Sequence, residues 1–371
     1  MSEIAREQRP GTANPAVSGP PSDLRAFIQK LSDAGRLQRV DAPIDWKLEI
    51  GSVARTTRRP LLFENIQGYP GQRLFTKGLY EWSAIAMAIG LDPKIQHTSL
   101  ITEARKRIAV SVEPVMVDQS PVLQNVLTRD SVDLFRFPVP RWSNYDAGRY
   151  LGTWHINVTK DLETEQRNVG VYRMQLLGSR QATVSASNGS DLARHVALAE
   201  KLRIPLPLAV AIGVPESVIM AAAAACPAGM DEYGLAGALQ QKPVELMRCR
   251  TADLDVPASS EIVIEGFIHP GIRVQDGPFL DYCGIPDTNP NAFLFEATSL
   301  LFRTDPVFRG SAIGMPGAED HQLFAFLAQL DLVDFHGSRP RQDYQNLLWK
   351  QRDFQALQRL GTASRLFARG R

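Results

Sequence analysis

The stretch Asn168-Val169-Gly170-Val171-Tyr172-Arg173 reads as a strand, yet it carries an amide and a cation where a core strand would be apolar. Buried polar groups need partners, so this stretch is where we expect a site. Two acidic stretches follow it: Asp231-Glu232-Tyr233, and Asp276-Gly277-Pro278-Phe279-Leu280-Asp281, in which two carboxylates flank a Gly-Pro turn. Because a nearby cation sets the proton affinity of a carboxylate, the arginine and these acids form a candidate active site.

The sequence around this stretch, from Gly152 onward, predicts β structure. Runs rich in β-branched and aromatic residues, separated by turn signals, predict strands over residues 155–159, 169–177, 208–213, 244–249, 261–267 and 292–302. Helices are expected over residues 191–202 and 215–225. Short strands with few long crossovers favour a barrel or a sandwich over a doubly wound parallel sheet. We therefore predict a mostly β domain over residues 151–335.

The residues before this domain predict alternating helices and strands. Ser22 is placed to cap a helix with apolar residues at helical spacing, and Gly35 is placed to end it. An α/β domain is expected over residues 21–115, followed by a proline-broken linker over residues 116–150. The segment 138–142 contains two prolines, which cannot donate to a ladder, so it cannot be a central strand. The predicted fold class is α+β.

The two ends of the chain have a different composition from the middle. Residues 1–20 are polar and rich in Pro, Gly and Ser, which predicts a disordered arm. Residues 336–371 have a strongly basic balance with leucines at helical spacing, which predicts a short, basic helical tail. Because no run of 18 apolar residues occurs, we expect no membrane span.

Charge and cysteine content restrict the function further. The 41 Lys and Arg residues nearly cancel the 40 Asp and Glu residues, so the sequence does not predict binding to nucleic acid or to an anionic membrane. The three cysteines are far apart and lack a CxxC spacing, which argues against both a disulfide framework and a zinc cluster. A cytoplasmic location is expected, and a homo-oligomer is compatible with the sequence.

Several motifs accompany these stretches in a fixed order. They are Asp23-Leu24-Arg25-Ala26-Phe27 and residues 62–65, 148–150, 168–175, 231–233, 236–238, 256–258, 261–266 and 276–281. Over residues 22 to about 310 the sequence thereby resembles the UbiD family of reversible decarboxylases. The resemblance implies an N-terminal α/β domain and a split β-barrel, like that of flavin reductases, that holds prenylated FMN. The resemblance also implies a C-terminal domain that dimerises and contributes a lysine to the cofactor phosphate. We expect no counterpart of this domain in the sequence after residue 335.

The activity that the resemblance implies is non-oxidative, reversible decarboxylation of an aromatic or α,β-unsaturated carboxylic acid. A flavin prenyltransferase would supply the cofactor, and a divalent metal, Mn²⁺ or Mg²⁺, together with K⁺ would tie the flavin phosphate to the protein. The family's catalytic arginine and two acids match Arg173, Asp276 and Asp281, of which Asp281 is expected to donate the proton that replaces CO₂. The alternative for these three residues is a surface ion-pair cluster.

The metal ligands that the resemblance implies are an Asn, a His and a Glu. Asn168 and Glu232 match the first and last, but Asp191 stands at the histidine position, which gives an all-oxygen set suited to Mg²⁺ or Mn²⁺. Both acids could instead be ordinary acids at helix starts. Further residues match positions that contact the cofactor in the family: Thr153, Gly170, Val171, Tyr172, Arg173, Ser190, Asp191 and Glu232.

Two other function classes remain open from the sequence. The first is a non-catalytic flavin-binding or assembly subunit derived from a decarboxylase. The second, a metal-dependent hydrolase, is disfavoured because the six histidines show no metal-ligand spacing and are expected to be structural or exposed.

Overall fold

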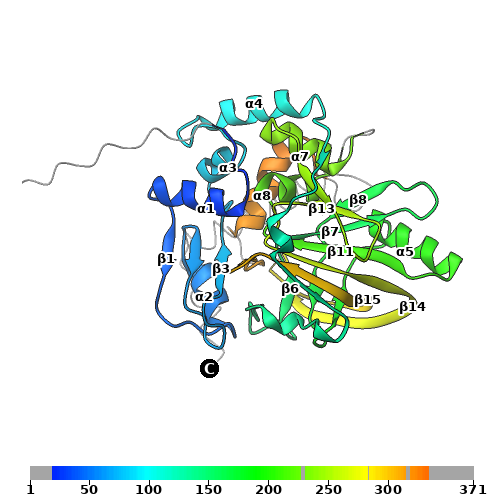
Figure 1. Cartoon of the computed structure of the whole chain (residues 1–371). Coiled ribbons are helices and arrows are strands. Elements are labelled where there is room, and N and C mark those ends of the chain that lie inside the picture. Colours follow the sequence, from blue (N-terminus) through cyan, green and yellow to red (C-terminus); the bar gives the residue numbers. More distant parts are fainter. Residues whose placement is uncertain (1–18, 227–229, 283, 315–317, 334–371) are drawn as a thin grey trace, which may run out of the picture.

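The computed structural model describes residues 19–226, 230–282, 284–314 and 318–333. Nearly all of the predicted N-terminal arm and the whole predicted basic tail lie outside these residues. The described chain is α+β, as the sequence predicts, with a small sheet and its helices beside a large, curled sheet (Figure 1). Within it, no helix is long and apolar enough to cross a membrane.

The small sheet has four strands in the order β1, β2, β3, β16. Its strands are β1 (Gln38–Val40), β2 (Leu61–Phe63), β3 (Arg73–Thr76) and β16 (Val307–Arg309). Strand β16 follows the strands of the large sheet in the sequence, and it pairs with β3 in parallel. The N-terminal sheet is therefore completed by residues that follow the predicted β domain's long strands.

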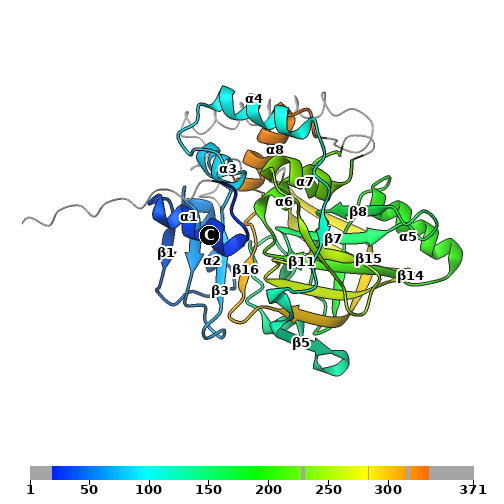
Figure 2. The same cartoon turned by 45° about the horizontal axis from the view of Figure 1, so that its top comes forward.

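Helices connect the strands of the small sheet to one another and to the rest of the molecule. They are α1 (Leu24–Asp33), α2 (Glu49–Thr56), α3 (Trp82–Ala88), α4 (His97–Ile108) and α8 (Glu319–Gln329). The N-cap of α1 is Asp23, one residue later than the predicted Ser22, because its carboxylate accepts a hydrogen bond from the amide of Ala26 at 2.8 Å. In both views α8 lies next to α3 and α7 (Glu232–Gln240) (Figures 1 and 2). Phe326 of α8 packs edge-on against Trp82 of α3.

The large sheet has seven strands and is built on one long antiparallel hairpin, β14 (Ile262–Leu280) and β15 (Pro286–Phe302). Its other strands are β5 (Asn125–Thr128), β7 (His155–Lys160), β8 (Arg167–Gly170), β10 (Gln181–Val184) and β11 (Leu206–Ile212). The order along the sheet is β10, β15, β14, β11, β7, β8, with β5 paired to β15. Register shifts interrupt the hairpin at several points, and such bulges bend strands and increase their twist.

Both faces of the large sheet are buried. Leu208, Val210 and Ile212 of β11 lie in one apolar cluster, whereas Ala209 and Ala211 of the same strand lie in the other. An antiparallel strand with one wet face would alternate apolar and polar residues. The near-continuous apolar run over this strand is therefore explained by helices on both faces of the sheet. α6 (Glu216–Ala222) and α7 (Glu232–Gln240) share the cluster of Ala209 and Ala211, whereas α5 (Asp191–Leu202) shares the cluster of Leu208, Val210 and Ile212.

The predicted linker contains more regular structure than the sequence suggests. It holds the 3₁₀ turns Pro121–Gln124, Arg129–Ser131 and Leu134–Arg136, and its strand β5 lies at the edge of the large sheet. As predicted, residues 138–140, which include both prolines of the segment 138–142, do not form a strand. The expected strand over residues 244–249 belongs to a separate sheet made of β13 (Asp255–Pro257), β12 (Glu245–Arg248) and β4 (Val115–Met116).

The predicted strand over residues 169–177 is broken in the middle. β8 ends at Gly170, and the chain resumes as β9 (Met174–Gln175), which pairs with β6 (Tyr150–Gly152). The break arises because Tyr172 folds back over Gly170: a Cβ there would lie 2.5 Å from the tyrosine ring. The amide of Tyr172 donates to Oδ1 of Asn157 at 3.2 Å instead of to a neighbouring strand. Residues 171–173 thus leave the sheet as a loop.

Candidate functional site

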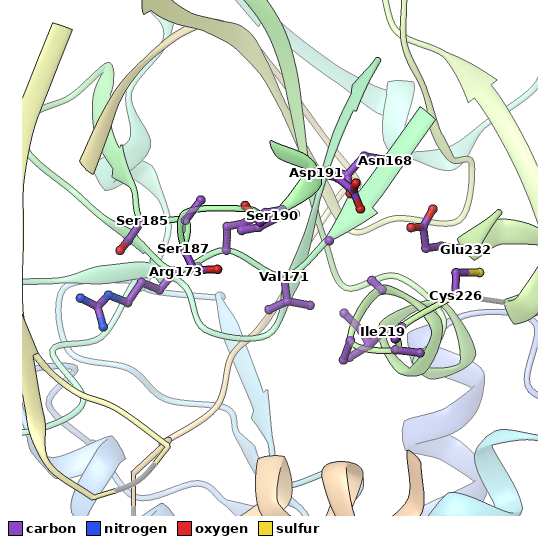
Figure 3. Close-up of a pocket in the computed structure, with 18 of the residues that line it drawn as sticks. Asn168, Val171, Arg173, Ser185, Ser187, Ser190, Asp191, Ile219, Cys226 and Glu232 are labelled. Atoms are coloured by element: carbon purple, nitrogen blue, oxygen red, sulfur yellow. The ribbon is translucent and has the colours of Figure 1, made fainter. Parts of the chain in front are cut away.

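A cavity of about 1310 Å³ lies where the loop 171–173 leaves the large sheet. Its wall combines this loop with residues 185–187 and 189–191, residues 222–226 and 230–232, residues 281, 282 and 287–290 of the hairpin region, and part of α8. Figure 3 shows Arg173 on one side of the cavity and Asn168, Asp191 and Glu232 on the other. Every site residue predicted from the sequence lines this cavity except Asp276, which is completely buried behind Arg173.

Arg173 is held in place by Asp276. Its Nε donates to Oδ2 of Asp276 at 2.6 Å, and the other carboxylate oxygen accepts from the Thr183 hydroxyl at 2.7 Å. The guanidinium also lies over the ring of Phe279, 5.5 Å from its centroid. A buried ion pair with both carboxylate oxygens satisfied is geometrically well defined. The structure therefore brings together the arginine and the first acid that the sequence singles out.

Asp281 is the second predicted acid, and it lies at the cavity side of the same arginine. Its Oδ2 is 4.0 Å from Nη1 of Arg173, and its Oδ1 accepts from the amide of Tyr282 at 2.7 Å. Burial raises the pKa of the Asp281 carboxyl, while the Tyr282 amide and Arg173 act in the opposite direction. The group is thus a carboxyl whose neutral form is favoured by its surroundings, next to a fixed cation.

The Gly277-Pro278 pair is not a free turn, in contrast to the sequence prediction. Both residues remain inside β14 as an irregularity in its pairing with β15. Gly277 has φ +98°, and a Cβ there would lie 2.6 Å from the carbonyl oxygen of Asp287. Glycine is needed at this position because both the left-handed backbone and the close approach of β15 exclude a side chain.

The close approach of β15 brings a third acid, Asp287, to Arg173. The sequence analysis does not predict this acid. Asp287 of β15 lies opposite Phe279 in the hairpin, and its Oδ2 is 2.9 Å from Nη2 of Arg173. The side chain of Asp287 is 55% exposed and lines the cavity. No motif points to it, because its place depends on the register of a hairpin whose pairing shifts several times.

The three predicted metal ligands come from three different elements. Asn168 lies in β8, and Asp191 and Glu232 are the first residues of α5 and α7. The Glu232 carboxylate accepts from the amide of Val169 at 3.3 Å. Burial, together with the charges of Asp231 and Asp191, raises the pKa of Glu232 to about 7. Asp191 is therefore close enough to Glu232 for the two carboxylates to repel each other.

Asn168 is oriented by a short hydrogen-bond chain. Its Nδ2 donates to Oγ1 of Thr159 at 3.4 Å, and the same oxygen is 2.9 Å from Nδ1 of His195. His195, which the sequence leaves as a structural or exposed histidine, is buried in this chain. Because the amide nitrogen is engaged, the amide oxygen is the atom left for a ligand.

The donor chemistry of this group fits a hard divalent cation. Two carboxylates and one amide oxygen are the ligands that Mg²⁺ and Mn²⁺ prefer, and a cation would relieve the repulsion between Asp191 and Glu232. Asp191 is ion-paired with Arg194, which a metal would have to displace. The described residues contain no group of three His, Cys, Asp or Glu side chains that could hold a metal, so a site here would need the amide of Asn168 as its third ligand.

The other residues predicted to contact the cofactor line the same cavity as Arg173 and the three predicted metal ligands. Thr153 is buried, and its hydroxyl accepts from the amide of Ser311 at 2.9 Å. Ser190 caps α5 by accepting from the amide of Ala193 at 3.3 Å. Val171 projects from the loop as one of the more exposed apolar side chains. The opposite wall is apolar, with Ile219, residues 222–226, Leu323 and Phe324.

The chain matches the family described as 3-octaprenyl-4-hydroxybenzoate carboxy-lyase in two consecutive regions. Its N-terminal domain matches residues 28–103, and its Rift-related domain matches residues 114–316. The fold and the site thus define a member of a family of carboxy-lyases. Because the second region alone spans more than half of the 371 residues, the chain belongs to the UbiD family, which confirms the resemblance found in the sequence.

Solved structures of this class have the same fold. HmfF from Pelotomaculum thermopropionicum, a UbiD-class enzyme in an evolved dimeric form with prFMN, is 29% identical with a TM-score of 0.74, covering 83% of this chain and 70% of that chain. Vanillic acid decarboxylase from Sedimentibacter hydroxybenzoicus in its closed form is 29% identical with a TM-score of 0.78, covering 82% of this chain and 66% of that chain.

A curated relative, an uncharacterized protein of Synechocystis sp., is 33% identical over 330 residues. The match covers 81% of this chain and 64% of that protein. The chain therefore spans less than two thirds of this relative's length.

Proposed function

We propose that this protein decarboxylates an aromatic or α,β-unsaturated carboxylic acid, reversibly and without net oxidation. The observation that carries the proposal is the geometry at Arg173: a guanidinium fixed from behind by the fully buried Asp276, with Asp281 beside it on the cavity side. A forked cation suits a substrate carboxylate, and a carboxyl kept neutral by burial suits proton donation.

The roles of the three residues follow from their positions. Arg173 orients the substrate carboxylate and Asp281. Asp276 takes no part in proton transfer, since both its oxygens accept hydrogen bonds away from the cavity, and it keeps Arg173 in one orientation. Asp281 delivers a proton to the carbon that loses CO₂, and in the reverse direction it removes that proton.

Prenylated FMN is the cofactor that we propose for the cavity, as in the relative crystallised with prFMN. When bound, it supplies the electrophilic centre that stabilises the charge left by departing CO₂. Asn168, Asp191 and Glu232 would hold Mn²⁺ or Mg²⁺ against its phosphate, together with K⁺. Thr153, Gly170, Val171, Tyr172 and Ser190 would frame the flavin. A flavin prenyltransferase would supply it.

Three finer points belong to the same proposal. We infer that the curled large sheet is a split barrel of the flavin-reductase type. The protein would act in the cytoplasm, where thiols such as Cys249 stay reduced. A homo-oligomer is compatible with the dimeric form of HmfF.

The test is co-production of the full chain with a flavin prenyltransferase, followed by an absorption and mass spectrum of the bound flavin and measurement of CO₂ release from a panel of aromatic and α,β-unsaturated acids. Bound prenylated flavin with CO₂ release from at least one acid is expected. Flavin retention without CO₂ release from any acid would instead support the non-catalytic, flavin-binding subunit. Absence of flavin would contradict both functions.

A further inference from the structure

Three carboxylates surround Arg173, and they are held very differently. Asp276 is fully buried and accepts two hydrogen bonds. Asp281 accepts one, from the amide of Tyr282. Asp287 is the most exposed of the three and makes an ion pair with Nη2 at 2.9 Å, but no hydrogen bond of its carboxylate is seen within the described chain. Asp287 is therefore the acid that can leave Arg173 at the lowest cost.

The geometry at Nη2 of Arg173 agrees with Asp287 being the most easily displaced of the three acids. Although Asp287 is close, no N–H of Nη2 points at a hydrogen-bond acceptor in the part of the chain that the structure describes. Arg173 and Asp287 both line the cavity, whereas Asp276 does not. The donors that a ligand could use are thus on the side of the guanidinium that Asp287 covers.

Charge balance gives Asp287 a consequence for binding. Arg173 already has two close ion-pair partners, Asp276 and Asp287, beside the carboxyl of Asp281, so an incoming carboxylate would add a further negative charge at this point. Neither Asp276 nor Asp281 can move away without breaking a hydrogen bond to Thr183 or to the Tyr282 amide. Only Asp287 can release Arg173 to another anion and turn to solvent.

We propose that Asp287 is a displaceable counter-ion of Arg173, which occupies the cavity side of the guanidinium until an organic carboxylate takes its place. Asp287 is accordingly a positioning residue that sets the affinity of the site for carboxylates. The inference rests on the proposed function, because it takes the substrate carboxylate to bind Arg173. The hairpin supports it structurally, since Gly277 lets β15 approach closely enough to bring Asp287 to the arginine.

A binding experiment separates displacement from a merely structural contact. The dissociation constants of 3,4-dihydroxybenzoate and of catechol, which lacks the carboxylate, would be measured by calorimetry on the full chain and on Asp287→Asn. Asp130→Asn is the matched control, because Asp130 is also an exposed partner of an arginine, Arg180, but lies outside the cavity. Asp287→Asn should bind the carboxylate about two- to fivefold more tightly, as expected for loss of an exposed competing ion pair. Catechol binding and the Asp130→Asn control should not change.

A second readout uses the pH dependence of decarboxylation. The charged groups that act on Asp281 are Arg173, Asp287 and Asp276; burial raises its pKa first, and the charge of Asp287 adds to this. Replacing Asp287 by Asn should therefore move the fall of activity with rising pH to lower pH. Because the bound carboxylate displaces Asp287, this shift should be seen in kcat/KM, which reports the free enzyme, and not in kcat; a contact that stays in place would move both profiles.

The outcomes are distinguishable. Equal or weaker carboxylate binding by Asp287→Asn, while the wild type binds 3,4-dihydroxybenzoate more tightly than catechol, overturns the role of Asp287 and leaves the proposed function standing. If neither protein prefers the carboxylate to catechol, and no other acid of the panel is bound or decarboxylated, both the inference and the proposed function are overturned.

Discussion

Two acids on the same arginine should affect stability to very different degrees when each is changed to Asn. Asp276 is fully buried and Asp287 is 55% exposed, although both lie within 3 Å of the Arg173 guanidinium. Asn at position 276 keeps an oxygen for Thr183 but removes the charge opposite Nε. Leaving a buried charge without its partner costs about 3–5 kcal/mol, whereas an exposed pair contributes about 0.2–1 kcal/mol.

These magnitudes translate into melting temperatures. For a domain of about 150–250 residues about 1 kcal/mol corresponds to roughly 2–4 °C, so Asp276→Asn should melt about 6–20 °C below the wild type. Asp287→Asn should melt within about 4 °C of it. Scanning calorimetry and urea unfolding of the three proteins, without added cofactor, provide the measurement. Equal melting of the two variants would refute the assignment of Asp276 as the buried anchor of Arg173.

The remaining predictions concern the proton, the metal side and one buried lysine. Asp281→Asn should retain flavin yet lose decarboxylation by about 10²-fold or more; a wild-type rate would require another acid. Thr159→Val should lower metal-dependent FMN retention in equilibrium dialysis, because Asn168 loses the partner that orients it, and unchanged retention would contradict this role. Burial lowers the pKa of Lys77 to about 8, so the folded chain binds fewer protons than the unfolded chain between about pH 8 and 10.5, and stability should rise with pH there. Lys77→Met should flatten that rise in urea titrations, and an identical slope would show that Lys77 is charged when folded.

The sequence alone was sufficient for the elements that have strong local signals. The helix Asp191–Leu202 was predicted to the residue, because Ser190 is a good N-cap and the apolar spacing is regular. The polar pair Asn168 and Arg173 predicted a site, because amides and guanidinium groups are not buried in a strand without partners, and both residues line the cavity. The order of the motifs was enough to recognise the family that the comparisons confirm.

What the sequence could not give is the outcome of long-range pairing. The break in the predicted strand over residues 169–177 depends on Tyr172 bonding Asn157, a residue of another strand. The fourth strand of the small sheet, Val307–Arg309, joins residues more than 200 positions away, which no local pattern records.

Asp287 shows the same limit within the site. Its contact with Arg173 exists because the irregular register of β14 and β15 places it opposite Phe279. Likewise, burial separates the roles of the acids around Arg173, and burial is a property of packing rather than of residue type. The sequence therefore determined which chemical groups are available and which local elements carry them, whereas the tertiary structure decided which of those groups meet, since a one-residue change of register would turn each side chain to the other face of its sheet.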